Sequence, residues 1–208
     1  MGEKNYFQSL TKEDRITVVL YRSGILFSAL ILGISAFILF KSLPGANSGE
    51  FPFVVSGLSI NILLLILYFS VGLSVFFIHL YIGKFHRVLK KIYFLAVACL
   101  CVLFFIGNGN PVMPLFRVPP YGALLLMPLS LCLGFVTAKE AFCFRLIEGY
   151  MLAVLMPAYV FFYSVGAFSG KSAAYSFMVI AAMLVFFTFR KIFMPVHYDI
   201  GDKSAYQP

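Results

Sequence analysis

Six stretches of the chain contain no Asp, Glu, Lys or Arg and consist mostly of apolar residues. A helix needs about 20 such residues to cross the hydrocarbon core of a bilayer, and five of the stretches are close to that length. The second is longer; if helical throughout it would reach about 45 Å and would have to tilt or protrude. The stretches are 23–40, 53–82, 92–107, 121–138, 149–168 and 173–189.

These stretches predict helices rather than strands. The alternation of apolar and polar positions that a membrane barrel requires is absent. In lipid, a segment without barrel partners can satisfy its backbone hydrogen bonds only as a helix. The fold class that we expect is therefore all-α, a polytopic helical transmembrane bundle with about six spans.

Lysine and arginine are distributed unevenly between the two sides that six spans would define. Of the 16 Lys and Arg residues, only Lys41, Arg117 and Lys171 fall on one side. The others lie before the first stretch, in the second and fourth connections, and after the last stretch. Because positively charged loops stay in the cytoplasm, this alternation predicts that both termini are cytoplasmic, and it agrees with six spans.

The composition excludes a soluble domain. Hydrophobic residues make up 62% of the chain and charged residues 12%, about half of the charged fraction that covers a soluble surface. We expect one integral membrane domain over residues 1–208, with short cytoplasmic tails at about 1–15 and 190–208. The net charge of +8 does not indicate nucleic-acid binding, because the basic residues flank the apolar stretches, where they meet lipid headgroups. The lipid bilayer is the expected partner.

Few residues within the stretches could carry chemistry, and we expect no catalytic site, no metal site and no cofactor. His79 lies near the end of the second stretch and His86 follows seven residues later, so on one continuous helix they would share a face. They would then form a proton or metal site, although an interfacial histidine packed beside Tyr81 is the commoner arrangement. Pro128 and Pro157 fall near the middles of two spans and are expected to kink them, because proline removes a helix hydrogen bond.

Three polar stretches carry a resemblance to a known family. They are His79-Leu80-Tyr81 followed by Arg87, Lys139-Glu140-Ala141-Phe142-Cys143 followed by Glu148, and Asp199-Ile200-Gly201-Asp202-Lys203-Ser204. In these stretches the chain resembles an uncharacterised family of bacterial and cyanobacterial integral membrane proteins, known as domain of unknown function 2301. The resemblance runs from about the second span to the C-terminus. It implies a multi-span membrane protein and supplies no activity. The location that we expect is the bacterial plasma (inner) membrane, or alternatively a thylakoid or plastid membrane.

All three stretches fall on the predicted cytoplasmic side, which suggests one polar cluster that closes the bundle there. Opposite charges in such a cluster would satisfy each other, and this matters because an unpaired charge near lipid is costly. The candidate members are His79, Arg87, Lys139, Glu140, Glu148, Asp199 and Asp202.

The sequence leaves three classes of function open. The leading hypothesis is a non-catalytic membrane component: an assembly factor, a scaffold or a subunit that binds a membrane-protein partner or a second copy of itself. The alternative is a small transporter or channel for a neutral or lipid-like solute, since no span has the central carboxylate or arginine typical of ion-coupled carriers. An intramembrane enzyme is least favoured, because no aspartate-rich or histidine-rich motif is present. A polar cavity reaching past the membrane centre would favour transport, and a solid core would favour the subunit.

Overall fold

The computed structural model describes residues 11–41, 57–80, 83–117, 120–195 and 197–200. Within these ranges the chain is helical and contains no strand. The long helices are α1 (Lys12–Lys41), α2 (Gly57–Phe77), α3 (Gly83–Ile106), α5 (Met127–Phe144), α6 (Ile147–Ser164) and α7 (Gly170–Ile192). The short elements are α4 (Met113–Phe116), the 3₁₀ helix η2 (Tyr121–Leu126) and α8 (His197–Ile200).

Six helical segments in the described ranges are long and apolar enough to cross a membrane, which confirms the six expected spans. The fourth of them, Tyr121–Phe144, joins η2 to α5. Several helices begin before their charge-free stretches; α1 begins at Lys12 and α3 at Gly83. Long charged side chains at a helix end can reach the headgroup region while the backbone stays helical, and charge therefore marks the end of the lipid-facing segment rather than the end of the helix.

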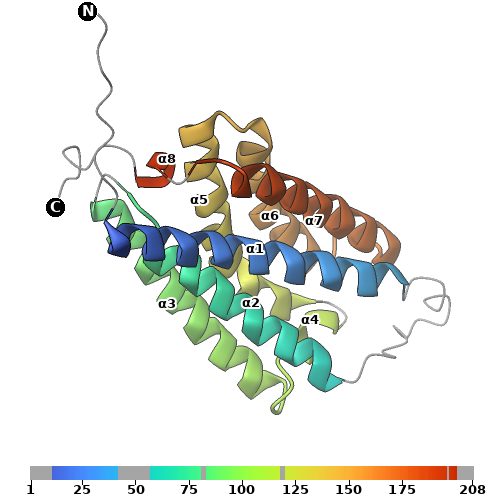
Figure 1. The fold of residues 1–208 in the computed structure, drawn as a ribbon. Coiled ribbons are helices and arrows are strands. Elements are labelled where there is room, and N and C mark those ends of the chain that lie inside the picture. The colour runs from blue at the N-terminus through green and yellow to red at the C-terminus, as the bar shows by residue number, and fades with distance from the viewer. Residues whose placement is uncertain (1–10, 42–56, 81–82, 118–119, 196, 201–208) are drawn as a thin grey trace, which may run out of the picture.

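The long helices form one bundle around a common interior (Figure 1). α1 packs against α2 and α7, and α5 packs against α6 and α3. Contacts of α6 with α7, and of α2 with α3 and α5, complete the arrangement. Successive spans run in opposite directions, so the first turns of α1 lie at the same end of the bundle as α8. We call this the tail end, and the opposite end the loop end.

α2 is shorter than the second apolar stretch predicted. It has 21 residues and ends at Phe77, so the helix of about 45 Å that the stretch 53–82 allowed does not form. The residues between Phe77 and Gly83 carry no Asp, Glu, Lys or Arg, and a pattern based on charge therefore could not locate the turn there. Because the helix ends before His79, that residue and His86 do not share one helix face.

Small residues allow the helices to approach closely at two crossings. At Gly24 of α1, an added Cβ would lie 2.4 Å from Ser74 Oγ and 2.6 Å from the backbone oxygen of Ser70 on α2. One turn further along, the hydroxyls of Ser28 and Ser70 lie 3.0 Å apart. Gly149 of α6 is similarly enclosed by α5 and α7. Such close packing stabilises helix pairs in lipid, where no hydrophobic effect drives them together.

The two prolines expected to kink their spans occupy different positions. Pro128 lies in the first turn of α5, directly after η2, where a missing N–H breaks no interior helix bond. The interior kink expected at Pro128 is replaced by a change from 3₁₀ to α-helix. Pro157 lies inside α6 and cannot donate the helical hydrogen bond to the carbonyl of Ala153. That carbonyl faces Gly134 of α5, where an added Cβ would lie 3.0 Å from the oxygen.

Candidate functional site

A fully buried carboxylate, Glu140 near the end of α5, lies at the tail end of the bundle. The Nζ atom of Lys139 lies 2.8 Å from its Oε1 atom, and Lys191 of α7 forms an ion pair with its Oε2 atom. The hydroxyl of Tyr21 on α1 donates a hydrogen bond of 2.7 Å to Oε1. A charge removed from water is tolerated only with such partners, so α1, α5 and α7 are all held to one carboxylate.

A second carboxylate, Asp199 of α8, extends these contacts toward the surface. Its Oδ2 atom accepts from Arg22 Nε at 2.6 Å, and its Oδ1 atom forms an ion pair with Lys191. Lys191 therefore bridges the two carboxylates, and it is only 1% exposed. Arg22 also donates to three backbone carbonyls at or just beyond the end of α7, at 2.7 to 3.2 Å. These bonds hold α8 against α1.

Aromatic rings complete the surroundings of the two lysines. Lys139 Nζ lies 5.3 Å from the centroid of the Tyr21 ring, and Lys191 Nζ lies 3.7 Å from that of Phe144. Both distances fall within the range of cation–π attraction, which is strongest where water is excluded. We refer to the following six residues as the ion network: Tyr21, Arg22, Lys139, Glu140, Lys191 and Asp199.

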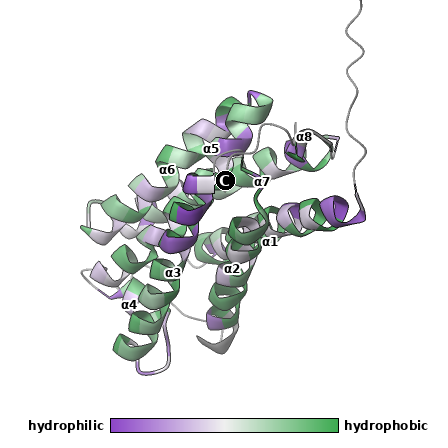
Figure 2. Cartoon of the chain, turned by 90° about the vertical axis from the view of Figure 1, so that its left-hand side faces the viewer, coloured by the Kyte–Doolittle hydropathy of each residue, from purple (hydrophilic) through white to green (hydrophobic). Residues whose placement is uncertain are grey.

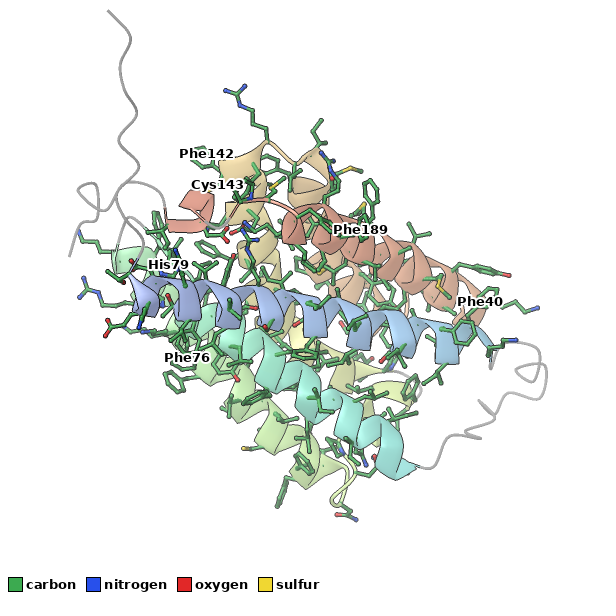
Figure 3. The ribbon with its side chains drawn as sticks, in the orientation of Figure 1. Phe40, Phe76, His79, Phe142, Cys143 and Phe189 are labelled. Carbon is green, nitrogen blue, oxygen red and sulfur yellow. The ribbon has the colours of Figure 1, made fainter. Side chains whose placement is uncertain are left out.

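His79 lies in the connection between α2 and α3 (Figure 3). It is close enough to Lys139 and Asp199 of the ion network for their charges to affect its pKa. Its Nε2 atom is 3.3 Å from the hydroxyl of Thr17 in the first turns of α1. Burial lowers the pKa of His79 below its ordinary value, and the positive charge of Lys139 acts in the same direction. The carboxylates of Asp199 and Asp14 oppose this shift. The imidazole is therefore neutral at pH 7 and acts as a polar contact between α1 and the end of α2.

The remaining candidate residues lie apart from the ion network. Glu148 at the start of α6 pairs with Arg190 of α7 in a separate, partly exposed contact. Arg87 is exposed on α3 and has no ion pair with any described residue. Asp202 lies outside the described residues. Of the seven candidates, Lys139 contacts Glu140 directly, and Asp199 is linked to Glu140 through Lys191. His79 lies next to them.

Three members of the ion network are absent from the candidates chosen from sequence: Tyr21, Arg22 and Lys191. Each lies at or just beyond the end of an apolar stretch, where it resembles an ordinary interfacial residue. Their partners are distant along the chain; Tyr21 and Glu140 are 119 positions apart. One feature of the sequence could have indicated the ion network. Glu140 and Lys191 lie only two residues beyond their charge-free stretches and can therefore still point into the bundle.

An apolar cavity of about 270 Å³ occupies the other half of the bundle, toward the loop end. Every long helix except α3 contributes to its lining, together with α4 and η2. On α1 the lining residues lie between Ile31 and Leu39, and on α7 between Gly170 and Ala181. Along α1, Ile31 lies roughly three helical turns beyond Tyr21 of the ion network. The cavity and the network therefore occupy opposite halves of the interior.

The polar atoms in the cavity lining are largely engaged already. The hydroxyls of Tyr159, Tyr163 and Ser130 donate to backbone carbonyls at 3.2, 3.1 and 2.8 Å. The lining therefore offers methyl, methylene and ring surfaces to whatever occupies it. Among the described residues, no three His, Cys, Asp or Glu side chains are grouped so that they could hold a metal ion.

The layer between the cavity and the ion network is closely packed. Ile25, Ser28 and Ser74 are almost completely buried there, and Gly24 brings α1 against α2 at the same level. The cavity therefore ends before the tail end of the bundle.

Comparison with known families adds one relationship. A model of the family described as uncharacterized integral membrane protein (DUF2301) matches residues 73–207, which is more than half of the chain. The chain belongs to the DUF2301 family. The matched part of this DUF2301 protein runs from the last turns of α2 through α8, whereas α1, which supplies Tyr21 and Arg22, precedes it. No curated protein and no solved structure matches the chain.

Proposed function

We propose that this DUF2301 protein binds one apolar or lipid-like solute in the partly open cavity lined by α1, α2, α5, α6 and α7. The observation that carries the proposal is the cavity itself, about 270 Å³ in volume and lined almost entirely by apolar side chains. Small-molecule pockets have volumes of about 300–1,000 Å³ and are mostly apolar, so this cavity suits a single hydrocarbon chain or a small apolar molecule.

A bound molecule would make van der Waals contacts with the lining side chains that are missing when the cavity is empty. Atoms that line a void lack dispersion partners on one side, and apolar cavities of about 150 Å³ in soluble proteins bind small hydrocarbons. A polar solute would gain little here, because the hydroxyls of Tyr159 and Tyr163 already donate to backbone carbonyls. The chemistry of the lining thus favours a lipid-like ligand.

The cavity changes the balance between the two hypotheses drawn from the sequence. A scaffold or partner subunit was expected to have a solid core, whereas a transporter or channel was expected to have a polar cavity reaching past the membrane centre. The cavity meets neither expectation fully, because the core is not solid and the lining is apolar rather than polar. It supports the transporter hypothesis only in its lipid-like form. The ion network and the packed layer beside it would then close the tail end of the binding site.

The orientation in the membrane is part of the same proposal. Among the described cations, only Lys41, Arg117 and Lys171 lie at the loop end, which favours a cytoplasmic tail end. The bacterial inner membrane is the proposed location. The binding site would then lie in the half of the bundle that is farther from the cytoplasm.

Native mass spectrometry of the protein, released from mild detergent, tests the proposal. We expect a lipid-like mass bound to the wild-type chain at one copy per chain. Ala181→Leu adds volume inside the cavity and should remove this mass. Ala182→Leu, one residue later and exposed on the outer surface of α7, makes the same chemical change and should retain it.

A second variant separates loss of binding from loss of folding. Ser130→Leu fills the cavity from α5, and filling a real void should leave the melting temperature unchanged or higher. Equal lipid binding by the two alanine variants would contradict the proposal. A protein that co-purifies at fixed stoichiometry, with no lipid in the cavity, would instead support the partner-subunit hypothesis.

A further inference from the structure

One exposed face of α3 changes character along its length. In the first three turns it carries three cations, and in the following turns it carries large apolar side chains (Figure 2). The cations follow the spacing i, i+3 and i+7, which places them on one side of a helix, and the apolar residues continue that side. We call this surface the α3 lipid face; it consists of Lys84, Arg87, Lys91, Phe94, Leu95, Val102 and Phe105.

The three cations of the α3 lipid face have no carboxylate partner among the described residues. α3 itself contains no Asp or Glu. The neighbouring Lys90 lies over the ring of Phe76 at 5.6 Å and is thus directed elsewhere. The carboxylates of Glu140, Asp199 and Glu148 are engaged by other cations. No ion pair with a described carboxylate therefore engages the positive charge at this end of α3.

The apolar part of the face is long enough for an acyl chain. At a rise of 1.5 Å per residue, the segment from Lys91 to Val102 spans about 16 Å. This is about half of the 30 Å hydrocarbon core, or the depth of one leaflet. Its side chains are open to the surroundings, with Phe105 86% exposed. Cations at one end and a leaflet-long apolar surface beyond them match the two parts of a phospholipid.

We propose that the α3 lipid face binds an anionic phospholipid, with the phosphate on the three cations and an acyl chain along the apolar part. The absence of acidic residues on α3 leaves no partner for a choline or ethanolamine nitrogen, so the site favours a net negative headgroup. A free phosphate would use the cations alone. This proposal is independent of the cavity, in which α3 takes no part.

The test measures lipid binding to the full chain in detergent by native mass spectrometry, together with the melting temperature. The probes are phosphatidylglycerol, phosphatidylcholine and inorganic phosphate. We expect phosphatidylglycerol to bind and to raise the melting temperature more than either other probe. Combining Lys84→Gln, Arg87→Gln and Lys91→Gln should weaken its binding by about tenfold or more, the order expected for three interfacial cations.

A matched control removes three other exposed cations. Lys41→Gln, Arg117→Gln and Lys171→Gln together make the same change in net charge and should leave the affinity within about twofold, since these exposed residues lie at the loop end, opposite the cations of α3. Phe94→Ser with Phe105→Ser keeps the cations and should also weaken phosphatidylglycerol binding. Undiminished binding by the first triple variant, or equal effects of phosphatidylcholine, would overturn the proposal. Equal stabilisation by inorganic phosphate would overturn the role of the acyl chain.

If the triple variant fails to fold, Lys84→Gln and Lys91→Gln are tested singly. Both side chains are exposed, so each variant should keep the wild-type melting temperature without added lipid. Each should still lose part of the stabilisation by phosphatidylglycerol, and no loss in either would overturn the proposal.

Discussion

The hydroxyl of Tyr21 donates a 2.7 Å hydrogen bond to Glu140, although the two are 119 positions apart in the chain. Neither side chain is exposed. The bond joins the first span to the end of the fourth, and the same carboxylate also contacts Lys139 and Lys191. The tail end of the bundle is therefore held by charge and hydrogen bonding, whereas the loop end contains a partly open apolar cavity.

Replacing the central carboxylate should destabilise the protein strongly. Glu140→Gln removes the negative charge that faces Lys191 and leaves a cation buried with one partner fewer. Breaking a buried ion pair in this way costs about 3–5 kcal/mol. The free energy of unfolding, measured by denaturation from detergent micelles, should fall by that order.

Glu148→Gln is the matched control, because it makes the same substitution in a partly exposed ion pair. The side chain of its partner, Arg190, is 44% exposed, and such pairs contribute about 0–1 kcal/mol. Equal losses in the two variants would argue against a special role for the ion network.

The hydrogen bond of Tyr21 can be tested without changing any charge. Tyr21→Phe keeps the buried ring and its contact with Lys139 but removes the donor to Glu140. Hydrogen bonds to charged groups contribute about 1.5–3 kcal/mol, against about 0.5–1.5 kcal/mol for neutral ones. Tyr159→Phe removes a 3.2 Å bond to a neutral carbonyl and should therefore cost less. The reverse order of the two losses would contradict this assignment.

Two glycines of α1, one of them at the crossing with α2, should respond in opposite ways to replacement by alanine. Gly24→Ala places a Cβ 2.4 Å from Ser74 Oγ and should cost about 1–3 kcal/mol through overpacking. At Gly33 the nearest atom to an added Cβ is Val185 Cγ2 at 3.5 Å, an ordinary contact. Gly33→Ala should be neutral or stabilising by up to about 1 kcal/mol, because alanine favours the helix. Melting temperatures of the two variants measured side by side check the prediction.

His79 predicts a pH dependence of stability below neutrality. Its pKa in the folded protein lies below the ordinary value of 6.5, first because of burial and then because of Lys139. As the pH falls through 6.5, the imidazole of the unfolded chain takes up a proton before that of the folded chain, which stabilises the unfolded state. Stability should therefore be constant above about pH 7 and decrease from pH 6.5 downward to the folded pKa.

The measurement compares melting temperatures of the wild type and His79→Gln between pH 8 and pH 5.5. Titration of the carboxylates affects both proteins, so the difference between them isolates the histidine. The wild type should lose stability relative to the variant below pH 6.5. A difference that does not change with pH would show that the imidazole titrates normally.

The six spans could be predicted from the sequence because lipid excludes charge along a whole helix. That exclusion gives each span a strong and continuous signal, and the structure confirms all six. The end of α2 at Phe77 could not be predicted, because the turn that follows carries no Asp, Glu, Lys or Arg. A helix end without charged residues cannot be located from the distribution of charge along the sequence.

The ion network could be predicted only in part. Lys139, Glu140 and Asp199 stood out as polar residues in stretches that carry the family resemblance. Tyr21 and Arg22 did not, because interfacial tyrosine and arginine are common and their partners are distant in sequence. Which face of each helix points inward depends on how the spans pack against each other. The sequence of a single span does not determine it.

Asp199 contacts both Arg22 and Lys191, and this arrangement has a consequence for synthesis. Chains emerge from the ribosome in order, so α1 reaches the membrane long before residue 199 exists. Until then, the guanidinium group of Arg22 lacks the carboxylate with which it pairs in the folded protein. A product truncated before α8 would contain all six spans and still lack this acid, so α8 distinguishes a fully translated bundle from an interrupted one.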